Sequence, residues 1–159
     1  MMIRAFFILR GFSVYVSLLL VIDMNILVID AQGGGIGKQL VTRIKKEIPD
    51  SFITAVGTNS IATSAMIKAG ADEGATGENS VVVACRNADV IIGPIGIMIA
   101  DAMIGEITPT MARSVAQSSA LRILIPFNMC NTFICGVQGS STSDMLTSAI
   151  NRLKEAIAE

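Results

Sequence analysis

The chain has 159 residues, of which 52% are hydrophobic and 16% are charged, and its net charge is −1. This length suits a single domain whose core folds without disulfides or metal ions. A near-neutral charge argues against a nucleic-acid partner, because proteins bind phosphate backbones with clustered lysine and arginine. The sequence has no histidine, which excludes Ser-His-Asp and Cys-His nucleophile systems and argues against a metal site.

Cysteine usage predicts a reducing compartment. The three cysteines, Cys85, Cys130 and Cys135, are odd in number and form no CxxC pair, so we expect the protein in the cytoplasm. The longest basic cluster lies in the segment 43–46 and is typical of the solvated face of a helix.

Residues 1–23 differ from the rest of the chain. Residues 5–22 form an apolar run interrupted by Arg10 and two serines. Three readings are open: a signal peptide, a membrane anchor, or residues translated upstream of the true start. A signal peptide needs a small-residue cleavage site, and an anchor would leave only about two residues between the bilayer and the first strand. Because Met24 directly precedes a strand-like segment, we expect the third reading, a domain of residues 24–159 and no membrane partner.

From Met24 onward the sequence alternates short apolar segments with amphipathic ones. This alternation predicts an α/β fold in which a mainly parallel sheet is covered by helices on both faces. We expect strands at residues 26–30, 52–56, 71–76, 90–93, 121–125 and 133–137. We expect helices at residues 36–48, 59–69, 80–87, 97–104 and 108–118, and a last helix that begins after Ser141 or Ser143. The predicted architecture is a three-layer, Rossmann-like domain with five or six strands.

Small or polar residues follow five of the predicted strands. In open parallel sheets, ligands bind beyond the carboxyl ends of the strands. Loops that only connect strands also favour glycine and asparagine, but these five would lie along one edge and together form a crevice. We therefore predict a binding site made by Asp30, Gln32, Gly33, Gly34, Gly35, Ile36, Gly37, Lys38, Thr58, Asn59, Ser60, Gly93, Pro94, Gly96 and Asn128.

The turn from Asp30 to Lys38 is the sharpest of these signals. Its glycines let a backbone approach a phosphate without Cβ clashes, and the helix that follows offers unpaired N–H groups. Lys38 stands in the first helical turn, where a cation needs an anionic partner or full solvation. The turn could also be a tight connection that needs glycine for packing alone. We favour a phosphate-bearing ligand, such as a nucleotide or dinucleotide.

This turn matches neither standard nucleotide fingerprint. The pattern G-x-G-x-x-G fits Gly33 and Gly35 but meets Lys38 in place of its third glycine. The pattern G-x-x-x-x-G-K-[ST] meets Gln32 at its start and Gln39 at its end. The second strand ends in Thr-Asn-Ser rather than in the acid that binds ribose in NAD enzymes, so it does not indicate NAD.

The acidic residues near the predicted site have structural readings as well as functional ones. Asp30 would repel a phosphate unless it is protonated, paired with Lys38 or bound to a metal ion. We expect it instead to accept hydrogen bonds from N–H groups of the glycine turn. The other acids near strand ends or helix starts are Glu78, Asp101 and Glu106.

The segment 97–104 predicts a homodimer. Apart from Asp101, it is apolar on every side of the helix that we expect there. A helix that is apolar all round is buried in the core or against a partner subunit.

Four blocks of the sequence resemble a known family. They are Asn25-Ile-Leu-Val-Ile-Asp-Ala-Gln-Gly-Gly-Gly-Ile-Gly-Lys-Gln-Leu40, Ala55-Val-Gly-Thr-Asn-Ser-Ile-Ala-Thr-Ser-Ala-Met66, Ile92-Gly-Pro-Ile-Gly96 and Gly105-Glu-Ile-Thr-Pro109. Over about residues 24–137 they are similar to the short bacterial proteins known as domain of unknown function 3842. The resemblance implies a Rossmann-like fold and a chain start near Met24, and it implies no activity or catalytic residues.

Two functions are open on these observations. The first is binding of a nucleotide or another phosphate-bearing small molecule at the turn Gly33 to Lys38, with or without catalysis. The second is a non-catalytic effector-sensing or interaction module that acts as a homodimer.

Overall fold

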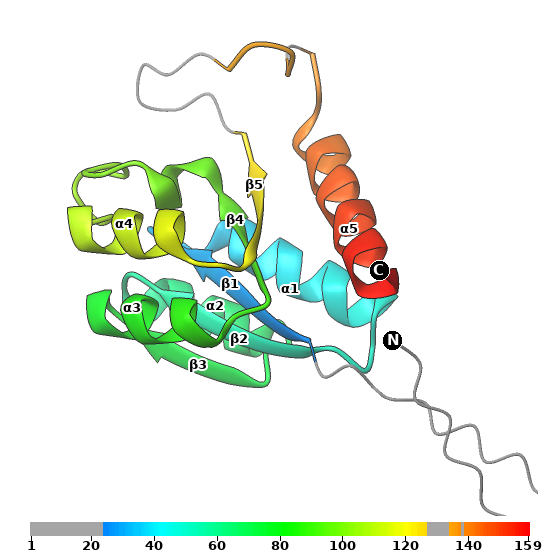
Figure 1. Cartoon of the computed structure of the whole chain (residues 1–159), viewed down its shortest axis with the longest axis horizontal. Coiled ribbons are helices and arrows are strands. Elements are labelled where there is room, and N and C mark those ends of the chain that lie inside the picture. The colour runs from blue at the N-terminus through cyan, green and yellow to red at the C-terminus, as the bar shows by residue number, and fades with distance from the viewer. Residues whose placement is uncertain (1–23, 127–133, 138) are drawn as a thin grey trace, which may run out of the picture.

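The computed structural model describes residues 24–126, 134–137 and 139–159 (Figure 1). Our expectations for residues 1–23, for Asn128 and for the start of a strand at Phe133 lie outside the described residues. The strands are β1 (Asn25–Asp30), β2 (Phe52–Gly57), β3 (Glu73–Thr76), β4 (Val90–Pro94) and β5 (Leu121–Ile125). The helices are α1 (Gly35–Glu47), α2 (Ser60–Lys68), α3 (Glu78–Asn87), the 3₁₀-helix η1 (Ile95–Met98), α4 (Pro109–Gln117) and α5 (Thr142–Ala158).

The five strands form one parallel sheet in the order β3-β2-β1-β4-β5. The chain therefore adds strands outward from β1 in one direction as far as β3, then crosses back and adds β4 and β5 on the other side. Between β1 and β4 the strand order reverses, and the connections that leave these two strands pass to opposite faces of the sheet. The predicted α/β fold with a parallel sheet is confirmed.

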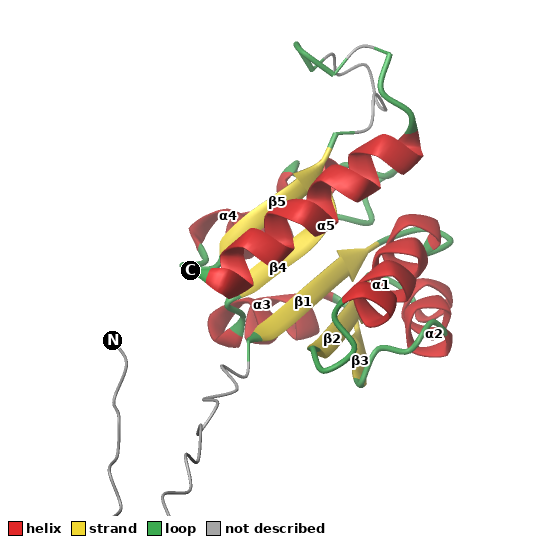
Figure 2. Cartoon of the chain, turned by 90° about the vertical axis from the view of Figure 1, so that its right-hand side faces the viewer, coloured by secondary structure: helices red, strands yellow, loops and turns green. Residues whose placement is uncertain are grey.

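Two hydrophobic cores lie on the two faces of the sheet, which gives the predicted three layers. On one face, Leu40 and Ile44 of α1 and Leu146 and Leu153 of α5 pack against alternate residues of β1, β2, β4 and β5, together with Met66 of α2. Figure 2 views the sheet from the side of α1 and α5. On the other face, α3, η1 and α4 cover the remaining alternate residues. Burial on both faces explains why β1 and β4 read as continuous apolar runs.

Three of the helices begin after residues whose side chains cap them. Asn59 caps α2 by accepting hydrogen bonds from the N–H groups of Ile61 and Ala62. Thr108 caps α4, with proline at the first helical position. Ser141, rather than Ser143, caps α5 in a capping box. Such caps satisfy N–H groups that have no partner inside the helix.

Two predicted elements are wrong. The segment 97–104 is not an α-helix: η1 ends at Met98, and the chain then continues in turns as far as Ile107. Ile97 is fully buried whereas Ile104 is 96% exposed, so this apolar run is not buried on all sides. The predicted strand at 133–137 is also wrong for its described part, because residues 134–137 form a turn and join no sheet.

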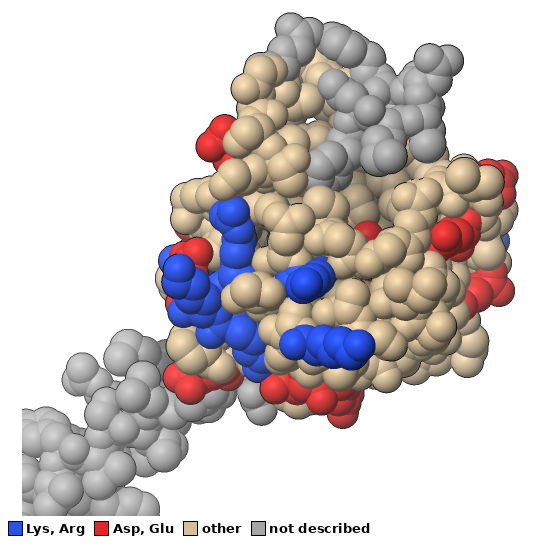
Figure 3. Space-filling view, turned by 180° about the vertical axis from the view of Figure 1, so that it is seen from behind, with Lys and Arg blue, Asp and Glu red and all other residues tan. Residues whose placement is uncertain are grey.

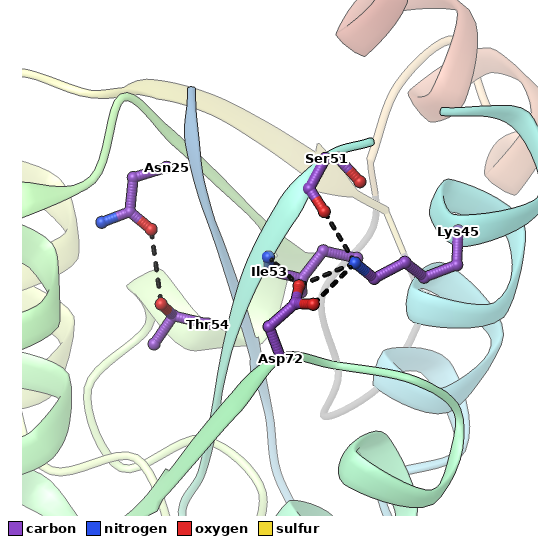
Figure 4. A network of polar contacts seen from close by, with 6 residues as sticks. All are labelled: Asn25, Lys45, Ser51, Ile53, Thr54 and Asp72. Carbon is purple, nitrogen blue, oxygen red and sulfur yellow. Dashed lines mark hydrogen bonds and ion pairs between the residues drawn. The ribbon is translucent and has the colours of Figure 1, made fainter. Parts of the chain in front are cut away.

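A polar network holds the amino edge of the sheet, at the opposite end of the strands from the predicted site (Figure 4). Lys45 of α1 donates to the carboxylate of Asp72 and to the carbonyl oxygen of Ser51. Asp72 also accepts from the N–H group of Ile53, the second residue of β2. The network fixes the loops that precede β2 and β3.

Lysine and arginine side chains gather on the face formed by α1, α2 and α5 (Figure 3). Several of them have partners: Lys154 pairs with Glu47, and Arg43 donates to the side chains of Ser143 and Thr147. These contacts tie α5 to α1. Of the basic residues in the segment 43–46, which we predicted to form a solvated face, Lys46 is exposed, whereas Arg43 and Lys45 are half-buried and donate to other elements. None of the helices in the described part of the chain has the length and hydropathy needed to cross a bilayer.

Candidate functional site

A cavity of about 680 Å³ opens between the carboxyl ends of β1 and β4. One side is the glycine turn, and the other is the segment that follows β4. The lining residues are Asp30, Ala31, Gln32, Gly33, Gly35, Ile36, Gln39, Pro94, Ile95, Gly96, Ile99, Ala100, Asp101, Ala102, Met103 and Ile104. A smaller cavity of about 380 Å³ between α3 and the strands β1 to β3 borders neither the turn nor the end of β4.

Two glycines of the turn have structural roles. Gly34 adopts a left-handed conformation with φ of 67°, and a Cβ there would lie 2.7 Å from the Cα of Ala62. Gly37 is buried, and a Cβ there would lie 2.8 Å from the Cβ of Asp30 and would also meet Met66. Glycine is therefore needed at both positions for backbone conformation or for close packing of α1.

The other two glycines, Gly33 and Gly35, have no such role. Neither has a positive φ, and a Cβ at either position would meet nothing within 4 Å. Both line the cavity. Within the described part of the chain, no group accepts a hydrogen bond from either amide. The turn thus lines the cavity with two glycines that carry no side chain and whose N–H groups have no acceptor in the described part of the chain.

The carboxylate of Asp30 lies buried beneath this turn, with 4% of the residue exposed. Its two oxygens accept hydrogen bonds from the N–H groups of Ala31, at 2.8 Å, and Gly37, at 2.6 Å. Burial raises the pKa of Asp30 above its ordinary value of 3.8, against the opposing effect of these bonds, and the charge of Glu106 adds to the rise. The expected hydrogen bonding of Asp30 to the turn is confirmed, and Asp30 makes no ion pair with Lys38.

Glu106 joins three parts of the site. One carboxylate oxygen, Oε2, accepts from the Gln32 N–H at 2.8 Å, from the Thr58 hydroxyl at 2.5 Å and from the Asn59 amide at 2.9 Å. The bond from Thr58, followed by those from Gln32 and Asn59, lowers the pKa of Glu106 below its ordinary value. Glu106 is therefore ionised at neutral pH, and it fastens the segment after β4 to the ends of β1 and β2.

The cavity wall from Ile99 to Ile104 has an unusual backbone. Asp101, Met103 and Ile104 have φ values of 62°, 56° and 61°, in the left-handed region that side chains disfavour. Backbone hydrogen bonds close the segment on itself, with the Asp101 N–H donating to Ile107 and the Ile107 N–H donating to Ala102. The wall is a compact loop that lines the cavity and leaves the apolar residues Ile99 and Ile104 exposed.

The structure brings most of the predicted site residues to one edge, but in different roles. Asp30, Gln32, Gly33, Gly35, Ile36, Pro94 and Gly96 line the cavity, whereas Gly34, Gly37 and the buried Gly93 support it. Lys38 and Ser60 are exposed beside it, and Thr58 and Asn59 donate to Glu106. The described residues contain no group of three acids or cysteines placed to hold a metal ion.

Two features of the site are not evident from the sequence. The apolar wall has the pattern of a helix that is apolar on every side, and Glu106 stands out only as an acid near a helix start. The contact between Gln32 and Glu106 spans 74 residues. No local pattern encodes a contact of that span, so only the tertiary structure identifies it.

The strand order, and a cavity at the point where that order reverses, define a doubly wound Rossmann-like protein. The chain belongs to the family described as Domain of unknown function (DUF3842), whose model matches residues 25–158. The predicted family membership is confirmed.

Among solved structures, the chain is similar to a dodecameric FMN-dependent Ubix-like decarboxylase from Escherichia coli O157:H7, with 15% sequence identity and a TM-score of 0.46. That match covers 86% of this chain and 96% of the other. No curated protein matches the chain significantly.

Proposed function

We propose that the protein binds a nucleotide, or another phosphate-bearing small molecule, in the cavity between the ends of β1 and β4. One observation carries this proposal: Gly33 and Gly35, which neither conformation nor packing requires to be glycine, line that cavity. A cavity of about 680 Å³ has the size of a site for a nucleotide-sized ligand. Its position at the reversal of strand order is where doubly wound sheets bind ligands.

The chemistry of the lining supports a ligand with one anionic end and one apolar end. The free N–H groups of Gly33 and Gly35 suit a phosphate at the start of α1, where the helix dipole favours negative charge. The side chains of Ile95, Ile99 and Met103 offer an apolar surface for a planar ring. The carboxylates near the turn already accept hydrogen bonds from the protein, so the free donors remain for the ligand.

A thermal-shift screen with ATP, GTP, NAD, NADP, flavins and coenzyme A tests this proposal. At least one of these ligands should raise the melting temperature, because a ligand that binds only the folded state stabilises it. If none of them shifts the melting of the folded protein, the proposal is wrong.

Lys38, in the first turn of α1, supplies a positive charge that we propose interacts with the phosphate of the ligand. Replacing it by alanine should weaken binding of the ligand found in the screen about severalfold, because the side chain is exposed and its charge is screened by solvent. Lys46→Ala, an exposed lysine near the other end of α1, is the matched control and should leave affinity unchanged. Equal affinities of the two variants would remove Lys38 from the site.

A second candidate is a homodimeric sensor or interaction module in the cytoplasm. The observation that favours it is the exposure of two isoleucines, Ile104 at 96% and Ile61 at 68%. Apolar side chains left in solvent often mark contact surfaces. Light scattering after size exclusion should then give twice the chain mass, and a lower mass for Ile104→Asn. A monomer at high concentration would contradict this candidate.

A further inference from the structure

A carboxylate lies at the end of β2, although the residues that follow this strand in the sequence include no acid. In doubly wound nucleotide-binding sheets, an acid at the end of the second strand accepts hydrogen bonds from ribose hydroxyls. Here β2 ends at Gly57 and is followed by Thr58 and Asn59, with no acid. Glu106, from the segment between η1 and α4, accepts hydrogen bonds from the side chains of both of these residues. The tertiary structure therefore places an acid at this position from another part of the chain.

The two oxygens of Glu106 are used unequally. All three hydrogen bonds, from Gln32, Thr58 and Asn59, go to Oε2. In the part of the chain that the structure describes, Oε1 accepts no hydrogen bond. The three donors hold the side chain in place, so Oε1 is a fixed acceptor with capacity left for a ligand.

An ionised carboxylate selects the group that it can bind. It accepts hydrogen bonds and donates none, so it repels a phosphate and suits a hydroxyl. Its contact with the N–H group of Gln32 places it one residue from Gly33, which offers a free N–H group to an anion. A hydroxyl acceptor beside an anion site matches the ribose and the phosphate of a nucleotide, which are covalent neighbours.

We propose that Glu106 binds a ribose hydroxyl of the ligand and so makes the site selective for ribonucleotides over 2′-deoxyribonucleotides. This inference rests on the proposed nucleotide binding at the glycine turn. In this proposal Thr58 and Asn59 are positioning residues, because both donate to the carboxylate of Glu106 and so orient it. Glu106 does not itself line the cavity, but it belongs to the loop of residues 99 to 107, whose residues 99 to 104 do.

The test compares matched pairs of ligands by titration calorimetry. ATP and GTP are titrated against 2′-deoxy-ATP and 2′-deoxy-GTP, first with the wild-type chain. The ribonucleotide that binds should bind about ten- to hundredfold more tightly than its deoxy form, as expected for a hydrogen bond to a charged acceptor. Glu106→Gln removes the charge and should reduce this preference to less than about threefold, because a neutral acceptor makes a weaker bond.

Glu78→Gln is the control. Glu78 is the first residue of α3, and its carboxylate accepts a hydrogen bond from the Thr108 hydroxyl. It makes no hydrogen bond to the glycine turn in the described part of the chain. Its removal should leave the ribose preference at the wild-type value. If Glu106→Gln does not fold, Glu106→Asp keeps the charge on a shorter side chain and should narrow the preference. An undiminished preference in that variant would overturn the assignment.

The outcomes separate this inference from the proposed function. Tight binding of a nucleotide with equal affinity for its deoxy form overturns the role of Glu106 and leaves the binding proposal standing. A ribose preference that survives in Glu106→Gln also overturns it. Failure of every nucleotide and cofactor of the thermal-shift screen to bind the folded wild-type chain overturns both.

Discussion

At the scale of single residues, Asp30 organises the glycine turn from below. Its carboxylate is buried and accepts hydrogen bonds from the N–H groups of Ala31 and Gly37. The acid thus satisfies a donor at the start of α1 that would otherwise lie buried without a partner. The N–H groups of Gly33 and Gly35 make no hydrogen bond to Asp30. The carboxyl group of Asp30 and the phosphate of the proposed ligand would therefore use different N–H groups.

The substitution Asp30→Asn should lower the free energy of unfolding by about 1–3 kcal/mol, because the amide nitrogen would face an N–H group and leave it unsatisfied. Urea unfolding followed by circular dichroism measures this change. Asp50→Asn, an exposed acid in the loop before β2, is the control and should change stability by less than about 0.5 kcal/mol. Equal effects of the two substitutions would contradict the role assigned to Asp30.

The stabilising effect of Asp30 should also depend on pH. Burial raises the pKa of Asp30 above 3.8, so the folded state holds this proton more tightly than the unfolded chain does. The free energy of unfolding that Asp30 contributes therefore falls as the pH rises from 3.8 through the folded-state pKa. The stability advantage of the wild type over Asp30→Asn should shrink over that range in urea unfolding. A stability advantage that grows with pH would contradict a raised pKa of the buried Asp30 carboxyl group.

At the scale of elements, the loop from Ile99 to Ile107 carries backbone strain. Ile104 has φ of 61° and is 96% exposed, so the side chain has little burial to offset the strain of this conformation. Ile104→Gly should raise the free energy of unfolding by about 0.5–1.5 kcal/mol, the strain relieved less the extra entropy of glycine in the unfolded chain. Thermal and urea unfolding measure the change.

Ile99 provides the opposite case within the same loop. Its φ of −108° suits any residue, and its side chain is 40% exposed. Ile99→Gly should therefore lower stability by about 1–2 kcal/mol through lost burial and added chain entropy. The two isoleucine-to-glycine substitutions should therefore change the free energy of unfolding in opposite directions. A loss of stability in both variants would mean that the backbone of Ile104 is not strained.

This loop also marks the limit of what the sequence could predict at this scale. The first residues of α2, α4 and α5 could be predicted from the local sequence, because capping residues such as Asn59 and Ser141 accept hydrogen bonds from N–H groups two or three positions further along the chain. The segment 97–104 offered only an unbroken apolar run, which fits a buried helix as well as a loop wrapped around a cavity. Its closure depends on Ile107 and on the contact of Glu106 with the end of β2, neither of which periodicity encodes.

At the scale of the whole molecule, the sheet order decides where a ligand would bind. The alternation of apolar and amphipathic segments was enough to predict a parallel, doubly covered sheet, and the glycine turn placed the candidate site at its carboxyl edge. The sequence could not separate Gly33 and Gly35 from Gly34 and Gly37, because that difference depends on what faces each Cα. The structure shows this difference. A substitution at Gly33 or Gly35 can therefore test ligand binding in the cavity without disturbing the fold.

The most direct test of nucleotide binding in this cavity is calorimetric titration of the wild type and Gly35→Val with the nucleotides and cofactors of the thermal-shift screen. A side chain at Gly35 would enter open space, so the variant should melt as the wild type does while its cavity is filled. Thr110→Val, which places the same side chain in the first turn of α4, is the control for helix propensity. We expect a ligand that binds the wild type and Thr110→Val to lose all measurable affinity for Gly35→Val. Equal affinity for all three proteins, or no binding to the folded wild type, would contradict nucleotide binding in this cavity.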